Sequence, residues 1–163
     1  MKILSGLLIF FLQILTVAVF PQEKQLLGLT PFDWDSSKES VKQIMSEKFN
    51  LLPGYEKEDA IGFEGGKYFG ENLHLWVFFF KEDKLDEIDM VIKNLNRPVN
   101  AIFYEVVHNI VDEYGDPDLF KADDWIAEWY YYDISGKKLN ATIKVSPYTN
   151  EIMTSIKISF LKI

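Results

Sequence analysis

The chain of 163 residues is 48% hydrophobic and 15% aromatic, and it carries a formal net charge of −8. This composition excludes an intrinsically disordered chain, because it supplies enough apolar surface for a packed core. The negative charge argues against binding to nucleic acid or to anionic lipids, whose phosphates an acidic surface repels. No cysteine is present, which excludes a disulfide framework.

Residues 1–18 are predicted to form a secretory signal peptide. Lys2 precedes a long apolar run, and Thr16 and Ala18 place small residues before a cleavage site after Ala18. The alternative is an uncleaved membrane anchor, since the run nearly reaches the roughly 20 residues that span a bilayer. No positive cluster follows the run, which favours cleavage. We therefore expect an exported protein, periplasmic or extracellular, with one domain over residues 19–163. Without Lys2 it has 16 basic against 25 acidic residues, a net charge of −9.

The first helix is predicted over residues 36–49. The hydroxyl of Ser36 is placed to accept a hydrogen bond from the amide of Glu39, whose side chain reaches back in a capping box. Apolar residues then recur at helical spacing up to Phe49. Three strands are predicted to follow, from apolar-rich stretches at residues 60–63, 73–80 and 85–93.

The same order of elements is then repeated. Apolar residues at helical spacing predict a second helix over residues 100–114, which Gly115 and Pro117 end. Strands are predicted at residues 125–132, 139–146 and 152–161, joined by turns at 133–138 and 147–150. We therefore predict a tandem αβββ repeat with subrepeats of about 29–95 and 96–163.

The predicted fold class is α+β. Short turns between successive strands favour antiparallel neighbours. Each predicted helix has one apolar face, which has to be buried against the sheet. These features predict a two-layer sandwich, in which two helices pack on one face of a mainly antiparallel sheet of about six strands.

Aromatic side chains are predicted on both faces of this sheet. In the strand at 73–80, the side chains of Leu73, Leu75, Val77 and Phe79 point one way and those of Trp76, Phe78 and Phe80 the other. Because the helices cover only one face, we expect a recognition surface on the open face, where Trp and Tyr give a large contact area at low entropic cost. The predicted partner-binding residues are Trp76, Phe78, Phe80, Tyr130 and Tyr132. The alternative is that they belong to the core, beneath long loops at 54–59 and 116–124 or beneath a second copy in a homodimer.

Three acidic residues are expected to lie around this open face. Glu71, Glu128 and Asp133 are predicted to form an acidic rim. Such a rim favours a basic partner through complementary charge.

The helix that ends in Tyr-Gly-Asp-Pro at residues 114–117, with antiparallel strands after it, resembles a group of small exported αβ modules. These are the BamE and SmpA outer-membrane assembly lipoproteins and the β-lactamase inhibitor protein. The tandem arrangement over Leu29–Ile163 is more similar to the inhibitor. That resemblance implies a concave, aromatic-rich sheet that holds a protein partner. The chain lacks the lipid-bearing cysteine of the first group and the disulfides of the second. No functional residue carries over beyond the turn at Gly115 and Pro117.

Few residues are candidates for catalysis or metal binding. His74 and His108 are the only histidines, and they are predicted to be surface or partly buried side chains rather than zinc ligands. The acidic residues over 112–124 do not fit the spacing of an EF-hand and are predicted to form a solvated turn. The glycines at 62, 65 and 66 lack the Lys-Ser or Lys-Thr pair of a phosphate loop and are predicted to mark a bulge or tight bend. No catalytic residue, cofactor site or metal site is predicted.

The sequence therefore predicts a non-enzymatic exported module that binds an envelope or secreted protein through the open aromatic face. Contact with a membrane is expected only through an uncleaved leader. The alternative function is the binding of a carbohydrate or an apolar small molecule in a pocket between the sheet and the loops.

Overall fold

The computed structural model describes residues 26, 28–94, 96–133, 135–136, 138–150 and 154–163. The predicted signal peptide, residues 1–18, lies outside these residues. The described residues form two helices and eleven strands: β1 (Gly28–Leu29), β2 (Phe32–Asp33), α1 (Lys38–Phe49), β3 (Pro53–Glu56), β4 (Ala60–Glu64), β5 (Lys67–Tyr68), β6 (Glu71–Lys81), β7 (Lys84–Ile92), α2 (Val99–Tyr114), β8 (Leu119–Lys121), β9 (Ile126–Tyr132), β10 (Leu139–Thr149) and β11 (Thr154–Lys162). Neither helix has the length and apolar content needed to cross a membrane.

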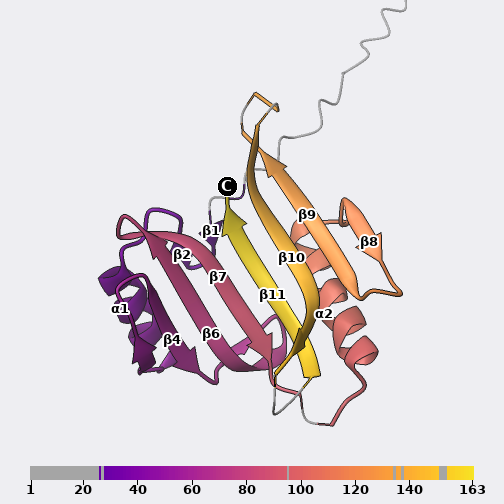
Figure 1. The fold of residues 1–163 in the computed structure, drawn as a ribbon, viewed down its shortest axis with the longest axis horizontal. Helices are drawn as coiled ribbons and strands as arrows, with labels where there is room; N and C mark the ends of the chain where they lie inside the picture. Colours follow the sequence, from indigo (N-terminus) through magenta and orange to yellow (C-terminus); the bar gives the residue numbers. More distant parts are fainter. Residues whose placement is uncertain (1–25, 27, 95, 134, 137, 151–153) are drawn as a thin grey trace, which may run out of the picture.

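Nine of the strands form one antiparallel sheet. Its order is β3-β4-β6-β7-β11-β10-β9-β8, and β5 pairs with one end of β6. The strands β1 and β2 form a separate two-stranded sheet. In Figure 1 the strands of the first half lie on one side of the large sheet and the orange and yellow strands of the second half on the other.

The two halves of the chain have the same plan. Each has one helix followed by four consecutive positions in the strand order of the main sheet, namely β3, β4, β6 and β7 in the first half and β8, β9, β10 and β11 in the second, and the first half adds the two-residue β5 beside β6. The last strands of the halves, β7 and β11, pair at the centre, with Asp89 opposite Ser159. The unit that recurs is therefore a helix with four strands, one strand more than the predicted αβββ unit.

The predicted fold class, with two helices on a sheet of about six strands, is wrong. About 50% of the described residues are in strands and 21% in helices, so the fold is dominated by its sheet. The additional strands β3 and β8 are short and lie at the two edges, where most of their side chains are exposed. An edge strand of this kind has no alternation of buried and exposed residues, which is why 54–59 and 116–124 were predicted as loops.

Both helices pack on the same face of the sheet. Phe78, Ile88 and Phe160 are cross-strand neighbours on β6, β7 and β11, so they share a face. The Trp76 ring lies on that face beside Phe78 and contacts Phe49 of α1, with 5.4 Å between ring centroids. Tyr114 of α2 lies 6.0 Å from Phe160. Figure 1 shows both helices behind the sheet, and the opposite face carries neither of them.

The ends of the helices agree only partly with the prediction. The side chain of Ser37, not Ser36, caps α1 by accepting a hydrogen bond from the amide of Ser40, so the predicted capping box with Glu39 is wrong. Ser36 instead accepts a hydrogen bond from the amide of Asp33. At the end of α2, Gly115 has a φ of +78° and its amide donates to the carbonyl of Val111.

The predicted turn at 147–150 is also corrected. Strand β10 continues to Thr149, and Pro147 is paired with Ile156 of β11. The register with β9 on the other side ends at Val145. Proline has no amide hydrogen to donate, and it is tolerated here because β10 has lost its second neighbour.

Candidate functional site: the open face of the sheet

The face of the sheet opposite the helices, which we call the open face, is built from three rows of cross-strand neighbours. The central row is Tyr55, Gly62, Val77, Asp89, Ser159, Lys144 and Glu128. One flanking row is Ala60, Phe79, Glu87, Leu161, Thr142 and Tyr130. The other is Glu64, Leu75, Val91, Lys157 and Ser146. Most of these side chains are half-buried by one another, and neither α1 nor α2 covers them.

The predicted partner-binding residues are divided between the two faces. Trp76 and Phe78 are fully buried and Phe80 is 8% exposed, all three in the core beneath the helices. Their side of β6 was assigned wrongly, because both faces of this strand are apolar and alternation alone does not tell which one the helices cover. Tyr130 lies on the open face as the neighbour of Thr142, and Tyr132, at the end of the same strand, is 43% exposed. The candidate site therefore retains Tyr130 and Tyr132.

A buried polar group at the centre of the open face was missed by the sequence analysis. The carboxylate of Asp89 accepts a hydrogen bond from the Ser159 hydroxyl at 2.5 Å and forms an ion pair with the Lys157 ammonium at 2.9 Å. Asp89 and Ser159 are almost fully buried. The signal in the sequence is an acidic residue between Ile88 and Met90, next to the apolar end of its strand.

Glu87 lies beside this polar group on the same strand. Its pKa is raised to about 7, first by burial, then by the negative charge of Asp89 and by a hydrogen bond between the two carboxyl groups. The Lys157 ammonium acts in the opposite direction, and Asp86 adds to the increase. The cross-strand neighbours of Glu87 are Phe79 and Leu161, which are both apolar. Among the ion pairs of the described residues, none includes Glu87.

A second polar group lies on β9 and β10. Glu128 forms an ion pair with Lys144 at 2.8 Å and accepts a hydrogen bond from the Tyr130 hydroxyl at 2.6 Å. These two interactions lower the pKa of Glu128, and the hydrogen bond to Glu128 raises the pKa of Tyr130 to about 12. The amide of Tyr130 also donates to Asp118 at 2.7 Å. Tyr130 is therefore held at both its backbone and its hydroxyl.

At the opposite end of the central row, the Tyr55 ring lies over Gly62. A Cβ atom at position 62 would be 1.9 Å from Cε1 of Tyr55, so only glycine leaves room for the ring. Tyr55 is 38% exposed, and its pKa is raised by burial and by the charge of Asp89. Gly65 and Gly66, predicted with Gly62 to mark a bend, have φ values of +84° and +86° between β4 and β5.

The three acidic residues predicted as a rim do not surround the open face. Glu71 is buried, and both of its carboxylate oxygens accept hydrogen bonds from Arg97, at 3.0 and 2.9 Å. Glu128 is paired with Lys144 within the face itself. Asp133 is partly buried in the turn after β9, where its side chain accepts a hydrogen bond from the Ser135 hydroxyl.

Among the described residues, the histidines and the acidic loop do not come together as metal ligands. His74 and His108 are both exposed, on β6 and α2 respectively. Across the part of the chain that the structure describes, no group of three or more His, Cys, Asp or Glu side chains is arranged to hold a metal ion.

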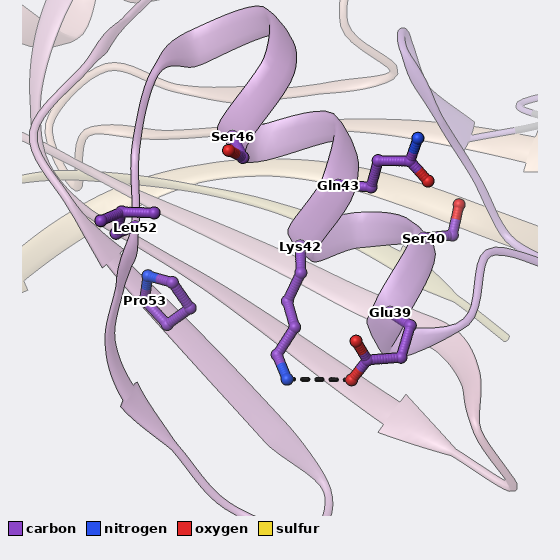
Figure 2. A pocket seen from close by; sticks show the side chains of 7 residues that line it. All are labelled: Glu39, Ser40, Lys42, Gln43, Ser46, Leu52 and Pro53. Atoms are coloured by element: carbon purple, nitrogen blue, oxygen red, sulfur yellow. Dashed lines mark hydrogen bonds and ion pairs between the residues drawn. The ribbon is translucent and has the colours of Figure 1, made fainter.

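A hollow of about 570 Å³ lies on the helix side of the molecule, between α1 and the start of β3 (Figure 2). Five of its seven lining residues are polar, and Leu52 and Pro53 form its apolar wall. Lys42 lies within it and is paired with Glu39 at 2.9 Å and with Glu56 at 2.8 Å. This hollow shares no residue with the open face.

Comparisons of the chain with protein-family models, with curated proteins and with solved structures found no match.

Proposed function

We propose that this chain is a non-enzymatic exported module that binds an envelope or secreted protein through the open face of its sheet. The observation that carries the proposal is the placement of both helices on one face, so that within the described part of the chain no second layer covers the three rows of side chains on the other. A sheet face that exposes partly apolar side chains across several strands is the kind of surface that marks a protein-interaction site.

The composition of the open face supports a protein partner. Tyr55, Tyr130 and Tyr132 offer aromatic rings with polar tips, and Phe79 and Leu161 add apolar area between them. Tyrosine is enriched in protein interfaces because it gives much contact area and loses little conformational entropy. The polar groups at Asp89 and Glu128 are satisfied within the face, so a partner does not have to supply hydrogen bonds for them.

The rigidity of the surface also supports binding. Most of its residues lie on long strands that pair on both sides, and the Tyr130 hydroxyl is held in place by Glu128. A surface whose side chains are already ordered loses less entropy when a partner binds.

The alternative, a small-molecule pocket beneath the segment 116–124, has less support. This segment contains β8, which extends the sheet at its edge as the neighbour of β9 and does not fold over the open face. A pocket for a sugar or an apolar ligand needs walls on several sides.

The test is a pull-down from envelope extract with three forms of the chain: wild type, a Tyr55→Ala Tyr130→Ala double variant and the control Tyr104→Ala. Tyr104 is 50% exposed on α2, on the opposite side of the molecule. Circular dichroism first establishes that all three are folded.

A protein that binds the wild type and Tyr104→Ala but not the double variant supports the proposal. Its dissociation constant, measured with purified components, should rise at least tenfold for the double variant, as expected when aromatic interface residues are truncated. Equal retention by the double variant, or retention that depends on Tyr104 instead, contradicts the proposal.

A further inference from the structure

We infer that the partner presents a lysine or arginine side chain to Glu87 at the centre of the open face, an inference that rests on the proposed function. The partner then carries a cationic side chain, and Glu87 is the residue of this chain that receives it.

Asp89 and Glu87 differ in how their charges are compensated. The Ser159 hydroxyl and the Lys157 ammonium occupy one oxygen each of the Asp89 carboxylate, at 2.5 and 2.9 Å. Lys157 is therefore committed to Asp89. Among the described ion pairs Glu87 takes part in none, and its carboxyl group is hydrogen-bonded to that of Asp89 instead of being paired with a cation. The carboxyl group without a cation is the more exposed of the two, so a partner can reach it.

The groups that face Glu87 leave an excess of negative charge. Its own strand contributes Asp89 and Asp86, and β11 contributes Lys157. The cross-strand neighbours Phe79 on β6 and Leu161 on β11 are uncharged. Two carboxylates and one ammonium therefore act on Glu87. The raised pKa of Glu87 agrees with this geometry, because the charged form is held among apolar and acidic neighbours.

The apolar neighbours also suit a basic side chain. The methylene stems of lysine and arginine pack against apolar surface while the charged end remains in a polar environment. Phe79 and Leu161 stand on either side of Glu87 and provide such a surface. A guanidinium group is attracted to an aromatic face as well. The net charge of −8 steers a basic partner toward this molecule.

The test uses nuclear magnetic resonance of the full chain with ¹³C-labelled glutamate carboxyl groups. The probes are N-acetyl-arginine methylamide and N-acetyl-lysine methylamide, with N-acetyl-norleucine methylamide as the neutral control, all at matched ionic strength. A cationic probe bound at Glu87 should lower the midpoint of its titration by about 1 pH unit, as an opposite charge at close range does. The amides of Phe79 and Leu161 should shift with it.

Two variants control the result. Glu87→Gln should abolish the probe-induced shifts at Phe79 and Leu161. Glu58→Gln, at an exposed glutamate in the turn between β3 and β4, should leave them unchanged. The inference is overturned if neither cationic probe lowers the midpoint of Glu87, if the neutral probe has the same effect, or if the shifts persist in Glu87→Gln.

The two proposals fail in different ways. One outcome is that the midpoint of Glu87 stays unchanged with the cationic probes while the Tyr55→Ala Tyr130→Ala variant still fails to retain the partner. In that case the inference is wrong and the proposed function stands. If retention of the partner does not depend on the open face, the proposed function fails whatever the probes do at Glu87.

Discussion

Tyr55 and Gly62 are in such close contact that a Cβ atom at position 62 would lie 1.9 Å from Cε1 of the tyrosine ring. Gly62→Ala should therefore displace the ring and destabilise the fold by about 1 kcal/mol, the low end of the cost of overpacking, because the Tyr55 side chain is 38% exposed and can move. The same substitution in a Tyr55→Ala background should cost much less, because the ring is gone. Urea unfolding of the two single variants and the double variant measures the coupling. Equal costs in both backgrounds would show that Tyr55 does not occupy this position.

Glu87 should make the stability of the protein depend on pH. Burial, followed by the charge of Asp89, raises its pKa from 4.5 to about 7. A carboxyl group whose pKa is higher in the folded chain stabilises the fold while it is protonated. That contribution is fully present below about pH 4.5 and is lost as the pH rises through 7. Glu87 is partly exposed, so solvent screening reduces the size of the effect.

The variant Glu87→Gln isolates this contribution. It should be more stable than the wild type at about pH 8, and the difference should shrink toward pH 5, where Glu87 is protonated in the folded chain. Urea unfolding across this range gives the difference, in which the titration of all other groups largely cancels. A difference that does not change with pH would contradict the raised pKa.

The hydrogen bond between Ser159 and Asp89 should contribute measurably to stability. Ser159→Ala removes a charge-assisted hydrogen bond at a buried position, at an expected cost of about 1.5–3 kcal/mol.

In Asp89→Asn, the negative charge that helps to raise the pKa of Glu87 is lost, so the titration midpoint of Glu87 should fall. Carboxyl ¹³C shifts of Glu87 report this directly, and a midpoint that stays near 7 would assign the increase to burial and to Asp86 instead of Asp89.

The aromatic residues of the two faces should differ sharply in their effect on stability. Trp76→Ala removes a fully buried ring from the core and should cost about 3–5 kcal/mol. Tyr132→Ala removes a side chain that is 43% exposed on the opposite side and should cost less than about 1 kcal/mol. Thermal or urea unfolding of the two variants compares them. Similar losses for both would place Tyr132 in the core.

Arg97 should stabilise the connection between β6 and α2. It is paired with the buried Glu71 and also contacts the exposed Glu105. Arg97→Ala leaves a buried carboxylate without its partner, which costs about 3 kcal/mol or more. Glu105→Ala removes only the exposed partner and should cost less than about 1 kcal/mol. If the two variants unfold at the same urea concentration, Glu71 does not depend on Arg97.

Sequence reasoning located those elements that have a strong burial pattern. The helix ending at Tyr114 is bounded at its last residue as predicted, because Gly115 and Pro117 leave little choice. The strands β6, β7, β9 and β10 lie where long apolar or alternating stretches predicted them. The edge strands β3 and β8 could not be found in this way, because they are held by pairing with one neighbour and bury few side chains.

The candidate site was harder to predict than the fold. Trp76 and Phe79 are equally apolar, and only the packing of α1 against Trp76 decides which of the two faces is open. The polar group of Asp89, Ser159 and Lys157 depends on the pairing of β7 with β11, between residues about 70 positions apart in the chain. No local pattern contains that information, because register between distant strands follows from tertiary packing.

The pairing of β7 with β11 also bears on what each half would do by itself. Either half, made as a separate polypeptide, would end in a long strand with one unpaired edge, and such edges recruit strands from other molecules. The peptide linkage between the halves keeps the second edge at a high local concentration and supplies it in the correct orientation. In the full chain the pairing of the two edges is therefore intramolecular. Two free copies of one half would have to make such a pairing between molecules.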